Sequence, residues 1–230
     1  MKILVFIPAR SGSLGIKNKN LKKLGEKKLI TYTFEISNKL SNSNFRAFLS
    51  TDSNIIKKIG KTFGFKDKYL RPKKLSGSKA NIIDAVFDGI NYLEKKNEKF
   101  THVLLLQPTS PFRTLQDIKK ILNIFKKKKL ESICSISRSI NNPIYYVEQK
   151  KANKWTYYFK KNKKIFNRQQ ASKNFFILDG SIYLSSIKFL KKYMKFVVIN
   201  KTFLFKPNNR FNIDIDENID LEIARKLIGK

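Results

Sequence analysis

A small-residue loop near the start of the chain carries the side chains best suited to hold a polyphosphate. The apolar stretch Ile3–Ile7 has the composition of a buried strand, and a loop over residues 8–20 follows it. This loop holds three cations, Arg10, Lys17 and Lys19, among glycines and serines. Glycine lets backbone N–H groups approach phosphate oxygens closely, and the cations neutralise their charge. The P-loop and G-x-G-x-x-G spacings are both absent, so the loop alone fits a nucleotide site or an ordinary turn.

Two carboxylates late in the chain, Asp214 and Asp216, have the spacing of a divalent-cation site. Alternate residues of an extended strand point to the same face, so these carboxylates converge. Mg²⁺ binds one or two carboxylates together with phosphate oxygens, which suits a site beside a polyphosphate loop. In the alternative interpretation Asp216 caps the last helix, with Glu217 favouring the positive helix end. The two roles are compatible if Asp214 binds the metal.

Further polar side chains follow predicted strands. Gln107 follows three leucines and precedes a proline-bracketed turn, where its amide could bind a sugar or a carboxylate, or satisfy its own turn. Arg71 precedes Pro72 and is therefore in an extended conformation, from which it could reach a base or a phosphate or face solvent. Asp52 closes a Ser-Thr-Asp run after another strand.

Strand-like and helix-like segments alternate through the first 137 residues, which predicts a mostly parallel sheet with helices on both faces. The predicted strands are Ile3–Ile7, Ala47–Ser50, Val103–Leu106, Ser132–Ser137, Gly180–Leu184 and Phe196–Ile199. The predicted helices are Leu29–Leu40, a helix capped by residues 51–53, Asn81–Leu93, one through Ile118 and Phe125, and one through Ile223 and Ile228. Ligands of such sheets bind at the carboxyl ends of the strands, where the polar motifs described above lie.

The composition of the chain changes over residues 141–178, which are rich in aromatic and basic residues and show no clear hydrophobic periodicity. Pieces such as Tyr145–Val147 and Trp155–Phe159 resemble short antiparallel strands. The density of aromatic residues favours an inserted lobe that forms a flap or a dimer contact over an unpartnered edge hairpin. We therefore expect a single domain over residues 1–230 with this lobe inside it.

The bulk composition is that of a folded and strongly basic globule. The 230 residues carry a formal net charge of +32, and 41% are hydrophobic. The lysines are spread over the whole chain, which favours solvated helix faces over a nucleic-acid site. One cysteine, Cys134, excludes an internal disulfide and fits a small buried side chain in a reducing compartment. With no membrane-length apolar run and no secretory leader, we expect a cytoplasmic protein that does not enter the membrane.

Together these motifs resemble the acylneuraminate cytidylyltransferases, that is, the CMP-sialic acid synthetases and their relatives. The resemblance covers essentially the whole chain and keeps the order of the motifs. They are I-P-A-R-S-G-S from Ile7, S-T-D from Ser50, R-P-x-x-L from Arg71, L-L-Q-P-T-S-P from Leu105 and D-I-D from Asp214.

The resemblance implies a Rossmann-like nucleotidyltransferase fold, a homodimer built by the inserted lobe, and a Mg²⁺-dependent reaction. In that reaction CTP and a nine-carbon α-keto acid sugar, of the sialic, legionaminic or pseudaminic type, give the CMP-sugar and pyrophosphate. Carried over by motif, the catalytic residues would be Arg10 and Lys19 on the triphosphate and Asp214 and Asp216 on Mg²⁺. Nucleotide-binding residues would further include Ser11, Gly12, Asn20, Arg71 and Asn81, and the sugar would contact Gln107, Arg168, Gln169 and Asp179.

The sequence departs from the family pattern at three places. Leu14 stands where the opening loop usually has a lysine, although Lys17 could replace it if the loop points it inward. An acidic residue is replaced near Ser78, and Asp179 stands for an asparagine. Two alternatives follow: a non-catalytic relative that only binds nucleotide, suggested by Leu14, and a nucleic-acid-binding protein, suggested by the charge. The sequence identifies neither the sugar nor a general base.

Overall fold

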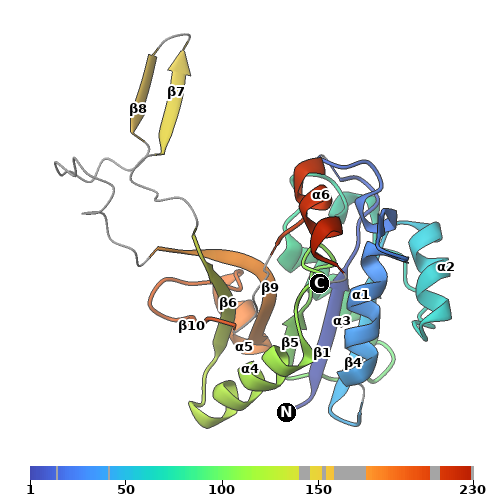
Figure 1. Cartoon of the computed structure of the whole chain (residues 1–230). Coiled ribbons are helices and arrows are strands. Elements are labelled where there is room, and N and C mark those ends of the chain that lie inside the picture. The colour runs from blue at the N-terminus through green and yellow to red at the C-terminus, as the bar shows by residue number, and fades with distance from the viewer. Residues whose placement is uncertain are drawn as a thin grey trace.

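A six-stranded sheet forms the centre of this computed structural model, in the order β10-β6-β9-β5-β1-β4 (Figure 1). The structure describes residues 1–13, 15–40, 42–139, 146–151, 154–157, 175–207 and 213–228. The six strands are β1 (Ile3–Pro8), β4 (Phe45–Ser50), β5 (His102–Leu105), β6 (Ser132–Arg138), β9 (Phe176–Ser186) and β10 (Phe203–Phe205). Strand β9 is antiparallel to both β5 and β6, and the other neighbouring pairs are parallel. The predicted mostly parallel sheet is confirmed.

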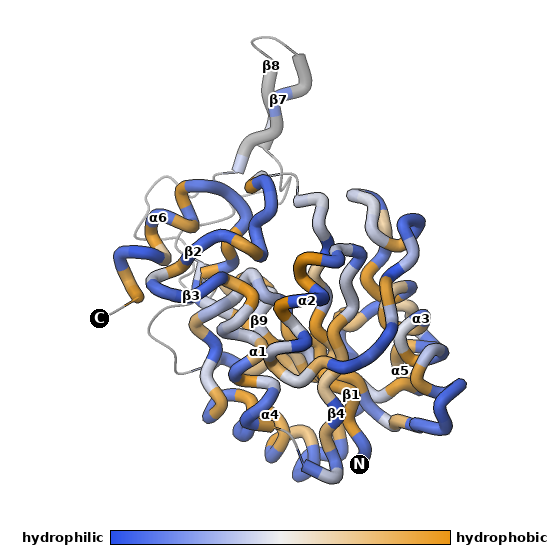
Figure 2. Tube along the Cα trace, turned by 90° about the vertical axis from the view of Figure 1, so that its right-hand side faces the viewer, coloured by the Kyte–Doolittle hydropathy of each residue, from blue (hydrophilic) through white to orange (hydrophobic). Residues whose placement is uncertain are grey.

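Helices cover both faces of this sheet because its buried strands are apolar on both sides. Ile3 and Val5 of β1 pack with α4 (Leu115–Lys127) and the end of α1 (Leu29–Leu40). Leu4 and Phe6 point the other way and pack with α3 (Ile82–Glu94) and α5 (Ile187–Tyr193). Figure 2 shows the strands as hydrophobic segments between more polar helices.

Smaller elements lie around the carboxyl end of the sheet. They are η1 (Lys19–Leu21), β2 (Lys23–Leu24), β3 (Lys27–Lys28), α2 (Asn54–Thr62), η2 (Lys73–Leu75) and α6 (Asn218–Leu227). The last helix, α6, packs through Leu221 and Ala224 against Ile16 and Leu24, with Ile215 in the same apolar cluster. The C-terminal segment is therefore fixed against the loop that follows β1.

The predicted helices lie where the sequence indicates, but one predicted strand is absent. Helix α1 has the predicted bounds, Ser53 caps α2 by accepting from the Ile56 N–H at 3.3 Å, and Asn81 caps α3. The prediction of a strand over Phe196–Ile199 is wrong, because these residues form bends and a turn. Phe196 is buried in the core, but Ile199 is 86% exposed and Asn200 has a φ of 60°. The strand at this edge is β10.

The predicted lobe lies largely outside the described residues. Within it, β7 (Val147–Lys151) and β8 (Lys154–Tyr157) pair antiparallel in a two-stranded sheet of their own. Short antiparallel strands were expected here. The bounds of the lobe within the domain stay a prediction.

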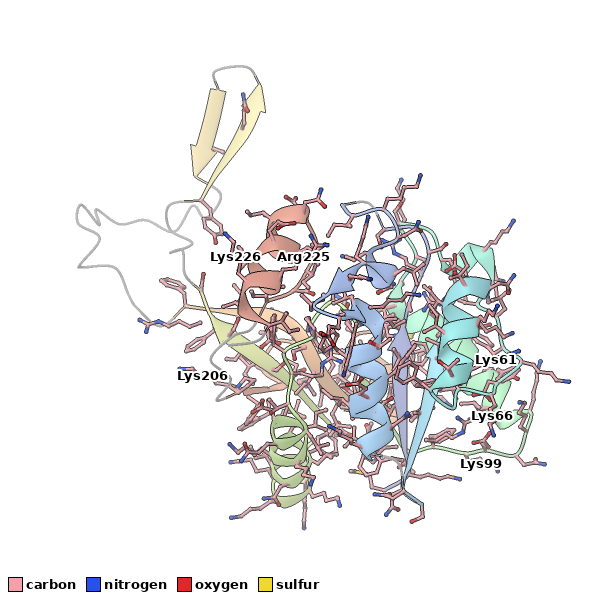
Figure 3. All side chains as sticks on the ribbon, turned by 45° about the vertical axis from the view of Figure 1, so that its right-hand side comes forward. Lys61, Lys66, Lys99, Lys206, Arg225 and Lys226 are labelled. Carbon is pink, nitrogen blue, oxygen red and sulfur yellow. The ribbon has the colours of Figure 1, made fainter. Side chains whose placement is uncertain are left out.

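The positive charge is distributed over the surface. The cations labelled in Figure 3 come from several segments of the chain, namely Lys61, Lys66, Lys99, Lys206, Arg225 and Lys226. Cys134 is fully buried, and this burial raises the pKa of its thiol to about 12, so the thiol stays neutral near pH 7. None of the described helices is long and apolar enough to cross a membrane.

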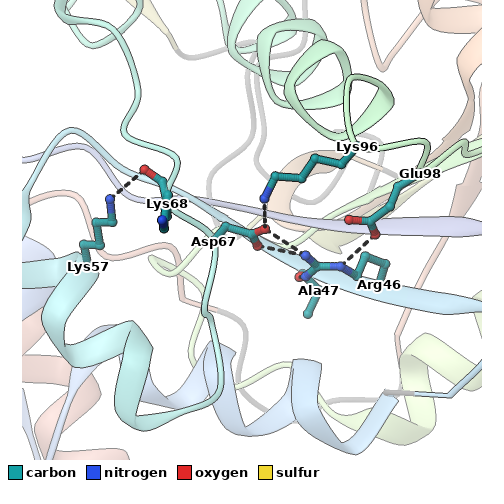
Figure 4. Close-up of polar contacts among 7 residues, drawn as sticks. All are labelled: Arg46, Ala47, Lys57, Asp67, Lys68, Lys96 and Glu98. Carbon is teal, nitrogen blue, oxygen red and sulfur yellow. Dashed lines mark hydrogen bonds and ion pairs between the residues drawn. The ribbon is translucent and has the colours of Figure 1, made fainter.

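An ion-pair network joins loops near the amino end of β4 (Figure 4). The Arg46 guanidinium donates to both carboxylate oxygens of Asp67 at 2.9 Å and to Glu98 at 3.0 Å. Lys96 lies 3.7 Å from the same Asp67 carboxylate. These charges neutralise one another at the end of the sheet opposite to the polar motifs.

We predict that Gly89→Ala destabilises the fold. A methyl group at Gly89 of α3 would lie 2.7 Å from a ring carbon of Phe48 and 2.9 Å from one of Phe6. Replacing a helical glycine by alanine ordinarily raises the free energy of unfolding by about 1 kcal/mol, but overpacking a rigid core lowers it by about 1–3 kcal/mol. We expect urea denaturation to show a lower free energy of unfolding. Gly12→Ala, whose new methyl meets nothing within 4 Å, is the control, and equal stability of both variants would contradict the packing argument.

Candidate active site

A pocket of about 520 Å³ opens at the carboxyl ends of β1 and β5. Its volume lies in the range of small-molecule sites. Eight of the predicted site residues line it, namely Arg10, Lys19, Asn20, Arg71, Asn81, Gln107, Asp214 and Asp216. The structure thus brings together residues from almost the full length of the chain, as the rule for open α/β sheets predicts.

The loop after β1 is held by side chains on both of its sides. The Asp52 carboxylate accepts from the backbone N–H of Ser11 at 2.8 Å and from its hydroxyl at 2.7 Å. The Asn20 amide donates to the Arg10 carbonyl at 3.2 Å. These bonds fix the backbone on either side of the Arg10 side chain, so its guanidinium enters the pocket from a fixed base.

Lys19 and Asp216, both predicted site residues, form an ion pair with each other. The Lys19 ammonium donates to the Asp216 carboxylate at 2.6 Å, with the lysine side chain 10% exposed and the aspartate side chain 70% exposed. Gly15 allows this approach, because a Cβ there would lie 2.3 Å from the Asp216 carbonyl oxygen. The cation predicted to bind phosphate and one of the carboxylates predicted to bind metal thus neutralise each other in the pocket.

Arg71 and Asn81 also line the pocket, and groups of the fold already occupy part of their hydrogen-bonding capacity. Arg71 is 5% exposed and donates to the hydroxyl of Ser50 at 2.9 Å and to its carbonyl. Burial lowers the pKa of the Arg71 guanidinium, against the effect of Asp52 nearby. The Asn81 side chain accepts from the Ile83 N–H at 3.0 Å as it caps α3, which leaves its NH₂ group as a donor.

The turn after β5 carries Gln107 and contacts the Asp-Ile-Asp segment directly. The Ile215 N–H donates to the Thr109 carbonyl at 2.8 Å. Ile215 is fully buried, so its two aspartate neighbours face the pocket that they line. The convergence of these carboxylates, predicted from their alternate spacing, is seen here.

The Asp214 carboxylate combines partial desolvation with a like-charged neighbour. Loss of solvent raises its pKa, and the charge of Asp216 adds to the increase. A hydrogen bond with the Thr109 side chain and the charges of Lys19 and Arg113 act in the opposite direction. On its far side, a Cβ on Gly180 would lie 2.7 Å from an Asp214 oxygen, so only glycine fits at that point of β9.

The remaining predicted residues lie elsewhere. Ser11 and Gly12 belong to the loop but do not line the pocket. Asp179 is 4% exposed and accepts from the Ser135 hydroxyl at 2.5 Å and the Ser181 N–H at 2.9 Å, inside the sheet. Lys17, the suggested replacement for a missing loop lysine, is exposed and is not a lining residue. Leu14, Arg168 and Gln169 lie outside the described residues.

Two residues of the Gln-Pro-Thr-Ser-Pro-x-Arg motif were missed as site residues. Thr109 lines the pocket and bonds Asp214, and Arg113 is buried directly behind it. Both lie within six residues of Gln107, in the polar motif noted after the predicted strand Val103–Leu106. An arginine in a polar turn is usually exposed, so its burial was not expected from the sequence.

The aspartate pair fits a divalent cation. Asp214 and Asp216 offer carboxylate oxygens, the hard ligands that Mg²⁺ prefers. Burial raises the pKa of Asp214 and the charge of Asp216 adds to the increase, so a divalent cation held by these residues would favour the charged carboxylates. Over the described ranges, no group of three or more His, Cys, Asp or Glu side chains gathers. Phosphate oxygens and water would therefore complete the coordination shell.

Comparison with protein families identifies the chain. The profile of the family described as Cytidylyltransferase matches residues 4–227, from β1 to the end of α6. The chain belongs to the cytidylyltransferase family. This cytidylyltransferase is accordingly a nucleotidyltransferase enzyme, and the fold and pocket described above are those of the matched region.

Three curated relatives align with this cytidylyltransferase over nearly its whole length. The CMP-N,N'-diacetyllegionaminic acid synthase of Legionella pneumophila is 30% identical, over 99% of this chain and 97% of the relative. The pseudaminic acid cytidylyltransferase of Campylobacter jejuni is 29% identical, over 99% and 96%. The N-acylneuraminate cytidylyltransferase of Escherichia coli is 29% identical over 97% of this chain, which spans only 51% of that relative.

Solved structures show the same fold. A CMP:2-keto-3-deoxy-manno-octonic acid synthetase complexed with CTP has a TM-score of 0.63 at 15% identity, covering 99% of this chain and 98% of its own. A 4-diphosphocytidyl-2C-methyl-D-erythritol synthase from Anaerococcus prevotii has a TM-score of 0.60 at 14% identity, covering 100% and 99%. The predicted nucleotidyltransferase fold is confirmed. The relatives named above are all enzymes by name, so they support neither a purely binding role nor nucleic-acid recognition.

Proposed function

We propose that this cytidylyltransferase transfers CMP from CTP to the anomeric hydroxyl of a nine-carbon α-keto acid sugar and releases pyrophosphate. The observation that carries the proposal is one pocket lined by Arg10, Lys19, Gln107 and the aspartate pair. The proposed sugar is of the legionaminic, pseudaminic or sialic type. That choice is supported by full-length relatives named for the first two acids and a partial match named for the third.

In the proposed reaction the anomeric oxygen attacks the α-phosphorus of CTP. The bond between that phosphorus and the bridging oxygen breaks, pyrophosphate leaves with the electron pair, and the hydroxyl loses its proton. Such a transfer depends mostly on positioning and on neutralisation of phosphate charge. Arg10 and Lys19 are placed to supply positive charge, because both project into the pocket from the loop after β1.

The remaining proposed roles follow the walls of the pocket. Asn20, Arg71 and Asn81 contact the nucleotide, with Ser11 and Gly12 shaping the loop, and Gln107 contacts the sugar. Asp214 and Asp216 hold Mg²⁺, which when bound neutralises phosphate oxygens as a Lewis acid. On the sugar side the proposal adds Arg168 and Gln169, of which Arg168 would pair with the sugar carboxylate. Asp179 is buried in the sheet outside the pocket lining, so it is not proposed as a direct contact of the sugar.

The proposal includes a cytoplasmic homodimer. A free, buried Cys134 is compatible with a reducing compartment. Three consecutive apolar residues at the start of β9, Phe176, Ile177 and Leu178, are 43%, 50% and 51% exposed. Because contiguous exposed apolar residues mark interaction surfaces, these three residues at the end of the inserted lobe support a contact between two copies.

We predict that the purified enzyme releases pyrophosphate from CTP and Mg²⁺ with at least one nine-carbon keto acid sugar. The assay compares legionaminic, pseudaminic and N-acetylneuraminic acids, with 3-deoxy-octulosonic acid as an eight-carbon outsider. Asp216→Ala should abolish most of the release, because it removes a proposed metal ligand. No release with any of these sugars, while CTP still raises the melting temperature, would favour a binding protein without turnover.

The Lys19–Asp216 ion pair leads to a second prediction. Binding of CTP without metal requires Lys19 to leave Asp216 for a phosphate. Asp216→Asn should therefore tighten metal-free CTP binding by up to about fivefold, which corresponds to a partly buried ion pair worth about 1 kcal/mol. Isothermal titration with EDTA present measures this change.

The matched control for that titration is Glu217→Gln. Glu217 lines the same pocket and carries the same charge, but Lys19 pairs with Asp216. If both variants tighten CTP binding equally, loss of repulsion between a carboxylate and the phosphates of CTP explains the effect. The proposed transfer of Lys19 from Asp216 to a phosphate is then refuted.

A third prediction concerns the dimer. Leu178→Lys places a charge on the exposed apolar strand and should convert the dimer into monomers in light scattering after size exclusion. Leu204→Lys, on the equally exposed β10 residue, is the control and should leave the mass unchanged. A monomeric wild-type protein would contradict the proposed assembly.

A further inference from the structure

A buried arginine outside the lining of the pocket stands between its two functional sides. Arg113 follows the turn that carries Gln107, is 4% exposed, and is not among the residues that line the pocket. It therefore cannot serve as a direct contact for CTP or sugar without movement of the wall. Its position has to be explained by what it does to its neighbours.

The hydrogen bonding of Arg113 is incomplete within the described residues. One amino group, Nη2, donates to the Gln107 carbonyl. The Nε and Nη1 groups are buried and have no hydrogen-bond partner, and the nearby Ser110 hydroxyl is in the same condition. Buried donors without partners are rare and costly, so they point to a function or to a bridging water.

Burial lowers the pKa of the Arg113 guanidinium, and two nearby carboxylates, Asp214 and Asp179, act in the opposite direction by stabilising its charge. Asp179 is held by Ser135 and by the Ser181 N–H. Asp214 has Gly180 packed against one of its oxygens, and it bonds Thr109. Arg113 therefore lies near one carboxylate that is fixed in the sheet and one that lines the pocket.

We propose that Arg113 is a positioning residue that sets the distance between the sugar side and the metal side of the pocket. Its bond to the Gln107 carbonyl fixes the turn that presents Gln107. The same turn carries Thr109, whose carbonyl accepts from the Ile215 N–H and whose side chain bonds Asp214, so the turn also holds the Asp214 carboxylate. This inference rests on the proposed function for the identity of the ligands, but the placement of Arg113 is independent of which sugar is used.

The test compares Arg113→Lys and Arg113→Met with the wild-type enzyme in the full chain. Mn²⁺ binding in the presence of CTP, followed by electron paramagnetic resonance, reports on Asp214 without turnover. Loss of a group that orients a metal ligand costs about 10- to 100-fold in metal affinity or activity. We expect such a loss for Arg113→Met, mainly in Mn²⁺ affinity and kcat, with the KM for CTP changed less. Arg113→Lys restores the charge without the planar fork and should recover only part of the loss.

Arg46→Met and Arg46→Lys are the matched controls. Arg46 is also an arginine between two carboxylates, but at the far end of the sheet. Its variants should lower the melting temperature and leave Mn²⁺ affinity unchanged. If Arg113→Met behaves like Arg46→Met, Arg113 is only structural and the proposal is overturned. If Arg113→Met does not fold, Arg113→Lys decides: wild-type Mn²⁺ affinity and kcat in that variant also overturn it.

The outcomes separate this inference from the proposed function. A wild-type enzyme that binds Mn²⁺ with CTP but releases no pyrophosphate contradicts the proposed function, and the Mn²⁺ titrations still test Arg113. A wild-type enzyme that binds no Mn²⁺ in the presence of CTP overturns the positioning role directly, because Asp214 then holds no metal.

Discussion

The site depends on the anchoring of Ile215 between two parts of the fold. Its N–H is bonded to the Thr109 carbonyl after β5, and its side chain is buried beside Ile16, Leu24 and Leu221. An extended residue with its side chain in the core leaves both neighbours on the opposite face. The hydrophobic effect on one isoleucine thus keeps the two carboxylates directed at the pocket, beside the turn of Gln107.

Positive and negative side chains are paired inside the pocket, whereas the chain as a whole carries a large excess of positive charge. The formal net charge of +32 is carried by side chains spread over the surface (Figure 3). Inside the pocket, Lys19 is paired with Asp216, and Asp214 lies near Arg113. A highly basic surface attracts anions over long distances. Within the pocket Lys19 and Asp216 are already paired, so binding depends on whether a ligand can replace a partner in this pair.

Most of the fold and the location of the site could be predicted from local patterns. The apolar run of β1, the helical period of α4 and the cap at Asn81 each reflect neighbours in sequence. Ligands of open α/β sheets bind at the carboxyl ends of the strands, so the polar motifs that follow the strands could be predicted to form one site. Contacts between distant residues could not be predicted. Neither the pairing of Lys19 with Asp216 nor the burial of Arg113 has a local pattern, and the apolar run Phe196–Ile199 fits a packed loop as well as a strand.

The Lys19–Asp216 pair joins residues separated by 197 positions in the chain. At a synthesis rate of about 5–20 residues per second, a ribosome reaches the second residue roughly 10–40 s after the first. For that interval the nascent chain already holds the loop of Arg10, yet it lacks the carboxylates that complete the pocket. Under the proposed function, the nascent chain therefore lacks both metal ligands until the ribosome has passed residue 216. A chain clipped before residue 214 would keep all six strands of the central sheet but lose both carboxylates.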